Sequence, residues 1–491
     1  MGFNLNQSDI FKRKNKYIIP VIILFIFFQT AGLAHASFTI EDEKKLVKEF
    51  YEKLEKSNVL IHDKKVSLYI NKIGNTVLAQ SNKAPFDFHF SVIDSSAINA
   101  FATPGGYVYV NRGLINMVEK ESELASVLGH EIAHVNARHI ASIIEKSQKV
   151  SIATLAAILA GAFLGGGGDL SAAAVSFSVA AATTLNLKYS REHEEEADRL
   201  GMSYLVSAGY DGKAMLEFMK KMRRYDFYSS NIPSYFLTHP GTDERITYID
   251  ALLHITYTHK GAESIVGNLK RIQTILGLRE KDLDASLKHF QNELQKNQND
   301  IDALYGIAVI QDKIGRTNES LSNFRKASSL APDDEDISRD LGIAYFKLGR
   351  TSEAIDILRK ALTHNEDDLD SVLYLGRSYE LQGDYTTALS LYKKIENKNI
   401  ADVDVYYSIA MAYGKTNNPG DSHYNFGIYF KKKNKLDSAL FHFKEALKYF
   451  PNYSEKFQEI EQEIKSIASR EKSPDATLRG TKRRGNLLDH R

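Results

Sequence analysis

Three apolar runs stand out from an otherwise mixed pattern of polar and hydrophobic positions along this chain. The first covers residues 17–28, and the other two, 150–164 and 172–187, lie on either side of four consecutive glycines. Each inner run is shorter than the roughly 20 apolar residues that a helix needs to cross a bilayer. Residues 150–187 therefore predict a helical hairpin with two alternatives: a mobile element that contacts a membrane or covers a cleft, or a buried helix pair that supports the helices of the candidate zinc site.

The first apolar run has the flanks of a secretory signal peptide. Basic residues at 12–16 precede it, and Ala34 and Ala36 follow it at the spacing of a cleavage site. We expect residues 1–36 to direct export to the periplasm and to be removed after Ala36, with an uncleaved signal anchor as the alternative. The chain has no cysteine, so disulfide bonds and a cysteine-linked lipid anchor are both excluded.

The second half of the chain repeats one hydrophobic pattern. Its clearest units begin at Ile301, Glu335 and Leu369, 34 residues apart, with a glycine near each expected turn between helices. This is the period of tetratricopeptide helix pairs, which stack into a solenoid whose concave surface binds extended segments or partner proteins. A degraded unit precedes these from about Gly267, and another begins at Gly420 after a break in register.

Candidate chemistry lies in the first half, at His130, Glu131 and His134. No glycine or proline interrupts residues 123–128 before them, which predicts a helix. Residues four apart share one face of a helix, and two imidazoles at that spacing can hold one tetrahedral Zn²⁺. Glu131 is offset along the helix, where it could deprotonate a metal-bound water. The pattern is typical of zinc metallopeptidases.

His139 is a weak candidate for the third ligand. The metzincin pattern places a third histidine six residues after the second, with a glycine between them, and this chain has Ile140 and Ala137 at those positions. On a continuing helix, His139 would lie about half a turn round from His130. We therefore expect it to face away, near the polar side of that helix.

Glu194 is the stronger candidate. At 100° per residue it shares a face with Ala197, Gly201 and Leu205, the side predicted to pack inward. A buried carboxylate is costly unless it is paired or bound to a metal. Asp198 lies one turn further on the same face, placed to hold a ligating imidazole in one tautomer.

These motifs resemble the HtpX and CAAX-prenyl-protease family of gluzincin metallopeptidases, in which a HExxH helix is followed by a Glu-x-x-x-Asp helix. The resemblance covers residues 40–255 and is greatest to secreted bacterial members with a C-terminal repeat array. It implies that Glu194 is the third ligand of one Zn²⁺ per chain. It also implies a mainly α fold, in which a zincin-like helical domain with a small β-sheet, from about 86 to 110, precedes the α-solenoid.

Two further segments match the family. Residues 98–107 resemble the strand and turn beside its cleft, so an extended substrate is expected to add to this strand through main-chain hydrogen bonds. The substrate-binding candidates there are Asn99, Ala100, Phe101 and Ala102.

The second segment is Thr238-His239-Pro240 with Arg245, which resembles the family's His-Pro-x-x-x-x-Arg segment near the active site. The resemblance makes His239 and Arg245 candidate stabilisers of the oxyanion. An alternative for His239 is that it occupies the open zinc position and holds the enzyme latent.

These features divide the chain into a signal peptide at 1–36, a zinc metalloprotease domain at 37–255, a repeat solenoid at 256–465 and a basic disordered tail at 466–491. The expected function is a periplasmic endopeptidase for misfolded or stalled envelope proteins, recruited through the repeats, which could also contact the envelope assembly machinery. A chaperone or assembly scaffold in which proteolysis is minor is the alternative, and an integral membrane protease is a further one. The net charge of +1 predicts no nucleic-acid partner.

Overall fold

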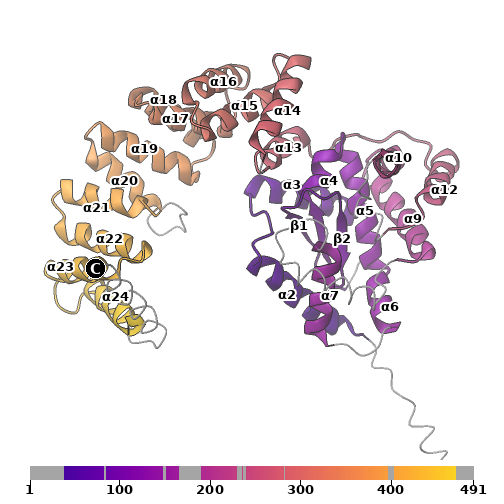
Figure 1. The fold of residues 1–491 in the computed structure, drawn as a ribbon, viewed down its shortest axis with the longest axis horizontal. Helices are drawn as coiled ribbons and strands as arrows, with labels where there is room; N and C mark the ends of the chain where they lie inside the picture. The colour runs from indigo at the N-terminus through magenta and orange to yellow at the C-terminus, as the bar shows by residue number, and fades with distance from the viewer. Residues whose placement is uncertain are drawn as a thin grey trace, which may run out of the picture. The chain divides into compact units, whose positions relative to one another are not determined.

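A computed structural model describes residues 38–81, 85–146, 151–164, 189–228, 235, 239–280, 282–395 and 403–471 (Figure 1). The expected signal peptide, the glycine run, the second inner apolar run and Thr238 lie outside the described residues. The chain forms two compact units, Met1–Gln273 and Thr274–Arg491, so the boundary falls later than the one expected at residue 255. Both units are mainly helical, which confirms the expected fold class.

A three-stranded sheet lies in the first unit, within the region expected at about 86–110. Its strands are β1 (His89–Ile93), β2 (Ala100–Thr103) and β3 (Tyr107–Asn111), in the order β1-β3-β2. β1 runs parallel to β3 and β2 antiparallel to it, which leaves β2 at an edge of the described sheet. The tight β2–β3 turn needs glycine: Gly106 has φ +95°, and a side-chain carbon there would lie 2.4 Å from the carbonyl oxygen of Asp87.

The helices of the first unit surround one central helix, α5 (Glu121–Asn136), in which every residue from Glu121 to Val135 is buried. It packs against the sheet and against α3, α9 and α10. The other helices among the described residues before residue 256 are α2 (Ile40–Lys56), α3 (Lys64–Leu78), α4 (Arg112–Met117), α6 (His139–Lys146), α7 (Ile152–Leu164), α9 (Arg191–Ser207), α10 (Lys213–Tyr228) and α12 (Thr242–Ile255).

Two glycines let α5 and α9 approach each other closely. A side-chain carbon at Gly201 of α9 would lie 2.9 Å from the amide nitrogen of His130, and one at Gly129 of α5 would lie 3.1 Å from the carbonyl oxygen of Gly201. Any larger residue at Gly201 would push the helix backbones apart. The contact therefore brings the HExxH helix and the Glu194 helix together.

The first arm of the expected hairpin is α7, and it supports the first unit from within. Leu155, Ala156 and Leu159 are buried in one hydrophobic cluster with residues of α2 and α6, including Phe50 and Ile144. The described arm is therefore buried, but the cluster that buries it contains no residue of α5 or α9, the helices it was expected to support. Among the described residues, no helix combines the length and the apolar character needed to cross a membrane.

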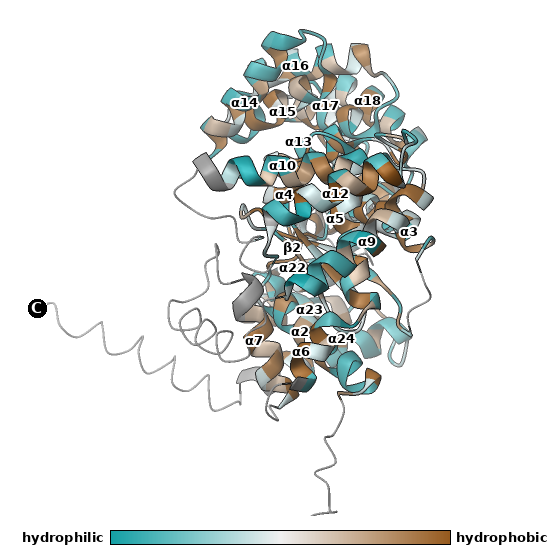
Figure 2. Ribbon diagram, turned by 90° about the vertical axis from the view of Figure 1, so that its right-hand side faces the viewer, coloured by the Kyte–Doolittle hydropathy of each residue, from teal (hydrophilic) through white to brown (hydrophobic). Residues whose placement is uncertain are grey.

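The second unit is a stack of helix pairs, and α15, α17 and α19 begin at the expected unit starts Ile301, Glu335 and Leu369. Hydrophobic residues of these helices pack in one buried cluster. Hydrophilic and hydrophobic positions alternate along the ribbons of α15 and α17 (Figure 2). After α13 (Leu269–Gly277), which spans the boundary, the helices are α14 (Leu283–Lys296), α15 (Ile301–Lys313), α16 (Thr317–Leu330), α17 (Glu335–Lys347), α18 (Thr351–His364), α19 (Leu369–Leu381), α20 (Tyr385–Ile395), α21 (Val405–Lys415), α22 (Pro419–Lys432), α23 (Leu436–Leu447) and α24 (Glu455–Glu471).

The sequence predicted a disordered tail from residue 466, but α24 continues to Glu471. Ile460 and Ile467 on this helix are fully buried, and they pack with Phe443 of α23. A hydrophobic face at helical spacing therefore holds the first residues of the expected tail in place. Residues 472–491 lie outside the described residues.

Candidate metal centre

The two histidines of the HExxH motif meet on the buried face of α5. His130 and His134 each expose 2% of their surface, and their Nε2 atoms are 2.9 Å apart. Both rings therefore direct the same nitrogen toward one point, as residues one helical turn apart can. Glu131 between them is fully buried, and neither carboxylate oxygen makes a hydrogen bond to the described residues.

Helix α9 brings Glu194 to the same point. Ser190 caps the helix by accepting a hydrogen bond from the backbone N–H of His193, which fixes where the first turn begins. The Glu194 carboxylate is fully buried, with Oε2 at 3.5 Å from His130 Nε2 and Oε1 at 3.6 Å from His134 Nε2. The inward face predicted from the helical period is therefore the face that the structure buries.

His239 completes the cluster. Its Nδ1 lies 3.0 Å from Glu194 Oε1 and 3.3 Å from His130 Nε2, and the ring is fully buried. One ligand atom from each of His130, His134, Glu194 and His239 lies within 4.8 Å of the others. Three imidazole nitrogens and a carboxylate oxygen are a donor set that Zn²⁺ prefers. Both carboxylate oxygens of Glu131 and Nε2 of His239 have no hydrogen-bond partner among the described residues, and burying such groups is costly unless a cation binds among them, so the site fits one metal ion.

Asp198 contacts the ring nitrogen of His130 that faces away from the cluster. Its Oδ1 lies 3.0 Å from His130 Nδ1. A carboxylate at this place keeps the proton on Nδ1 and leaves Nε2 free to bind a metal. This is the placement that helical spacing predicts for Asp198.

Arg245 contacts two buried carboxylates. Its Nε and Nη2 donate to the two oxygens of Asp198, each at 2.7 Å, and its Nη1 lies 2.5 Å from Glu194 Oε2. The geometry therefore contradicts the oxyanion role considered for Arg245, because all three of its nitrogens face carboxylates. The buried guanidinium instead neutralises and positions the two acids of α9.

The charges of the centre shift its acids in opposite directions. Burial opposes the ionisation of Glu194, but Arg245 and His239 hold the pKa of that carboxyl well below its usual value. Burial raises the pKa of Glu131, and the neighbouring His239 and His130 only partly offset this. A ligand that stays ionised beside a carboxylate with an elevated pKa suits a metal-binding group next to a general base.

His139 was expected to face away from the centre, and this expectation is wrong. Helix α5 ends at Asn136, and Arg138 adopts a left-handed conformation with φ +53°. The chain therefore turns before His139 begins α6, and counting 100° per residue no longer applies. The His139 ring is buried, with its Nδ1 2.8 Å from Nδ1 of His134.

The substrate-binding candidates lie on or next to β2 and are all buried. Ala102 lines a recess with His134, whereas the Phe101 ring packs in the core against Phe50 and Tyr109. The backbone carbonyl of Asn99 accepts a hydrogen bond from the N–H of Asn111. The structure thus brings the strand, but not the Phe101 side chain, to the metal centre.

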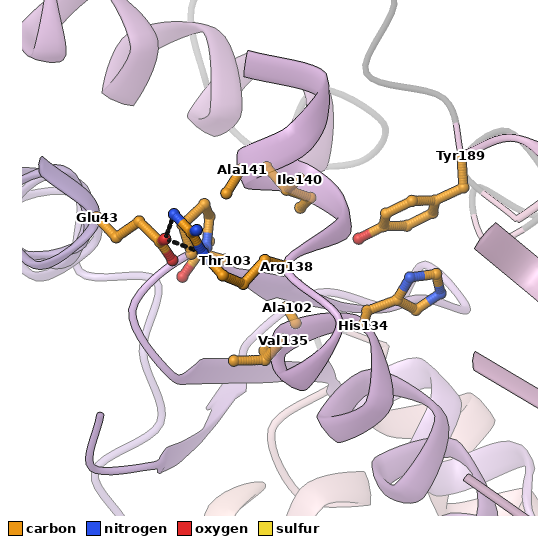
Figure 3. Close-up of a pocket in the computed structure, with 10 residues that line it drawn as sticks. Glu43, Ala102, Thr103, His134, Val135, Arg138, Ile140, Ala141 and Tyr189 are labelled. Carbon is orange, nitrogen blue, oxygen red and sulfur yellow. Dashed lines mark hydrogen bonds and ion pairs between the residues drawn. The ribbon is translucent and has the colours of Figure 1, made fainter. Parts of the chain in front are cut away.

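Tyr189 and Tyr235 belong to the centre but were not found from the sequence. The Tyr189 ring stacks on His134 with centroids 3.8 Å apart, and the Tyr235 ring stacks on His239 at 4.4 Å. Figure 3 shows Tyr189 and His134 on the same side of the recess, which the Glu43–Arg138 ion pair closes at its other end. Neither tyrosine lies in a recognisable motif, and only the position of Tyr189 next to the Ser190 cap could have drawn attention to it.

Comparison with known protein families agrees with this geometry. The family model of peptidase family M48 matches residues 65–253, the segment that supplies every residue of the metal cluster. The first unit contains an M48 peptidase domain. Tetratricopeptide repeat models match residues 301–334 and 339–401, and they place the solenoid after the M48 domain.

Several curated relatives are named as proteases or metalloendopeptidases. A putative beta-barrel assembly-enhancing protease of Vibrio cholerae is 33% identical over 54% of this chain and 55% of its own length. The beta-barrel assembly-enhancing protease of Escherichia coli K12 is 33% identical over 43% of this chain and 44% of its own length. A mitochondrial metalloendopeptidase of Schizosaccharomyces pombe is 32% identical over 38% of this chain and 53% of its own length. The chain thus spans about half the length of the curated relatives it matches.

Two solved structures match this chain with low TM-scores. The tetratricopeptide protein YrrB is 17% identical, with a TM-score of 0.31, over 40% of this chain and 97% of its own. MamA is 24% identical, with a TM-score of 0.29, over 31% of this chain and 90% of its own.

Proposed function

We propose that this protein is a periplasmic zinc endopeptidase that cleaves misfolded or stalled envelope proteins delivered by its repeat solenoid. The observation that carries the proposal is the convergence of His130, His134 and Glu194 on one buried point with Glu131 beside them. The M48 match supports the chemistry, and the relatives named as beta-barrel assembly-enhancing proteases support the setting.

The residues of the chain suggest how peptide hydrolysis would proceed. His130, His134 and Glu194 would hold Zn²⁺, which when bound polarises a carbonyl and acidifies a water. Glu131, which is fully buried beside the three ligands, would take the proton from the attacking water and pass it to the leaving amine. Burial of the cluster excludes bulk water and strengthens these electrostatic interactions.

The substrate would lie extended along β2. This strand pairs with β3 on one side and lies at an edge of the described sheet, and Ala102 and His134 line the same recess. An added strand would form main-chain hydrogen bonds that do not depend on sequence. That mode suits an enzyme for unfolded clients of many sequences.

Metal analysis of the purified full-length protein, combined with a casein digestion assay, tests the enzyme. We expect close to one Zn²⁺ per chain in both the wild type and Glu131→Gln. Digestion should fall by at least about 100-fold in Glu131→Gln, within the range by which acid–base groups accelerate reactions. Wild-type protein that binds no zinc, or a Glu131→Gln variant that digests casein normally, would refute the proposal.

His239 supports a second proposal, that the centre is held latent. Its ring lies within the ligand cluster rather than beside it, with Nδ1 3.0 Å from Glu194 Oε1. As a fourth ligand it would occupy the position that a substrate carbonyl or water needs. His239→Ala should then raise casein digestion, whereas a fall would favour the oxyanion role.

The alternative function is a chaperone or assembly scaffold in which the repeats carry the function and proteolysis is minor. The solenoid, which offers helix pairs of the kind that bind partner proteins, favours it. Complementation of a deletion strain separates the two functions. If Glu131→Gln fully restores assembly of envelope proteins, the scaffold function accounts for the phenotype, and if it fails while accumulating normally, proteolysis does.

A further inference from the structure

His134 faces a histidine where a ligating imidazole usually faces a carboxylate or a carbonyl. Its Nε2 points into the metal cluster, 2.9 Å from His130 Nε2, so its Nδ1 is the nitrogen that must be held from behind. For His130 that partner is Asp198. For His134 it is Nδ1 of His139, at 2.8 Å.

The direction of each hydrogen bond follows from the tautomers. A His134 ring that offers the Nε2 lone pair to a metal carries its proton on Nδ1, so it donates to His139. His139 can accept on Nδ1 only if its own proton lies on Nε2. That nitrogen lies 3.2 Å from Glu196 Oε2, which can accept the proton's hydrogen bond.

The surrounding residues hold the His139 ring in this orientation. His193 of α9 stacks on it with centroids 4.4 Å apart and planes inclined by 17°. The left-handed conformation of Arg138 turns the chain so that His139 faces back toward α5. Arg138 is itself tied to Glu43 of α2 by a hydrogen bond of 2.7 Å from Nε.

We propose that His139 and Glu196 form a relay that fixes the tautomer and the ring orientation of His134, and so determines how tightly the centre retains its metal. His139 is a positioning residue, since its contact is with the ligand and not with the ion. The inference rests on the proposed zinc site. Partners of this kind typically change metal affinity by about 10–100-fold when they are removed.

Zinc affinity of the full-length protein, measured by competition with a chromophoric chelator, tests the relay. His139→Leu keeps an apolar side chain of moderate size but removes the acceptor, and we expect it to bind zinc about 10–100-fold more weakly. His139→Asn places its amide oxygen near the position of Nδ1, so it should keep most of the affinity. Glu195→Gln, on the exposed side of α9, is the matched control and should bind as the wild type does.

Each outcome decides the matter. Zinc affinity in His139→Leu equal to that of the wild type would overturn the relay, because His139 would then have no effect on metal retention. An equal loss of affinity in His139→Leu and His139→Asn would also overturn it, because the loss would then come from altered packing and not from the missing hydrogen-bond acceptor. If His139→Leu does not fold, Glu196→Ala gives the answer, since it frees His139 to adopt the tautomer that opposes His134. Affinity in Glu196→Ala equal to that of the wild type would then refute the relay.

Failure of the relay is distinguishable from failure of the proposed zinc site. Wild-type protein that does not compete with the chelator at all would refute the zinc site. Tight binding by both wild type and His139→Leu would refute only the relay. Excess zinc should restore casein digestion by His139→Leu, as expected for a residue that affects retention and not the chemical step.

Discussion

At the scale of single residues, Arg245 is the counter-charge of the metal centre. It contacts Asp198 through two hydrogen bonds and Glu194 through an ion pair, and only 6% of it is exposed. Removing one partner of a buried ion pair leaves the other charge buried without compensation. Arg245 is thus the first of the neighbours that keep the two buried acids of α9 ionised, with His239 and His130 adding to its effect.

Arg245→Leu should lower the free energy of unfolding by about 3–5 kcal/mol, because Asp198 and Glu194 would remain buried without their cation. Urea unfolding of the metal-free protein measures the loss. Arg191→Leu is the control, since Arg191 pairs with Glu244 at an exposed site. Equal unfolding free energies in the two variants would contradict the role assigned to Arg245.

Zinc affinity should rise with pH up to about 9. Burial opposes protonation of His130, but Asp198 and Glu194 outweigh it and raise the pKa of His130 to about 9. Below that pH the metal-free ring carries a proton that zinc must displace, and above it the proton is already gone. Chelator competition at a series of pH values measures this, and an affinity independent of pH between 6 and 9 would contradict it.

At the scale of elements, the close contact of α5 with α9 brings the two zinc motifs together. Both motifs could be placed from the sequence because each lies within one unbroken helix, where a period of 3.6 residues fixes which side chains share a face. The same counting failed at His139, since a left-handed residue ends α5 before it. It could not find Arg245 as the partner of Asp198 either, because their contact joins α12 to α9 through the fold.

Gly201→Ala should lower the unfolding free energy by about 1–3 kcal/mol, because its new methyl group would lie 2.9 Å from the His130 amide nitrogen and force the helices apart. Zinc affinity should fall with it, since the motion separates Glu194 from the histidines. Gly277→Ala is the control, because a side-chain carbon there meets its nearest neighbour at 3.5 Å. Zinc binding by Gly201→Ala at wild-type strength would show that the helices tolerate the wider spacing.

At the scale of the whole molecule, Glu121 ties the segment that leads toward the repeats to the first residue of α5. Only 1% of Glu121 is exposed. Its carboxylate accepts hydrogen bonds of 2.7–2.8 Å from three consecutive backbone N–H groups, those of Ile265, Val266 and Gly267. Three hydroxyl groups also donate to it, those of Tyr210 at 2.9 Å, Ser264 at 3.1 Å and Tyr69 at 3.2 Å. The solenoid and the starts of its repeat units could be predicted from the sequence, since local hydrophobic spacing encodes them. The hydrogen bonds of Glu121 could not be predicted, because they join residues far apart in the chain.

Glu121→Gln should destabilise the first unit by about 1–3 kcal/mol, because a neutral amide cannot accept so many hydrogen bonds. Burial opposes ionisation of Glu121, but the N–H donors hold its pKa below the usual value. Its contribution is therefore complete above the pKa of an unfolded glutamate and is lost as the pH falls through the lower folded value. Limited proteolysis should cut the variant faster than the wild type near residues 264–267. Glu263→Gln is the control, because the Glu263 side chain is half-exposed. Cleavage of Glu121→Gln at the wild-type rate would contradict the role assigned to the Glu121 hydrogen bonds.

Burial of the ligands also governs how fast the ion can turn over. His130, His134 and Glu194 each expose 2% of their surface or less, so a bound ion can leave only while the unit opens transiently. Isotopically labelled zinc added to loaded protein should accordingly replace the resident ion at the rate of that opening. The supply of zinc at the moment when a chain folds would therefore decide whether that copy takes up its metal.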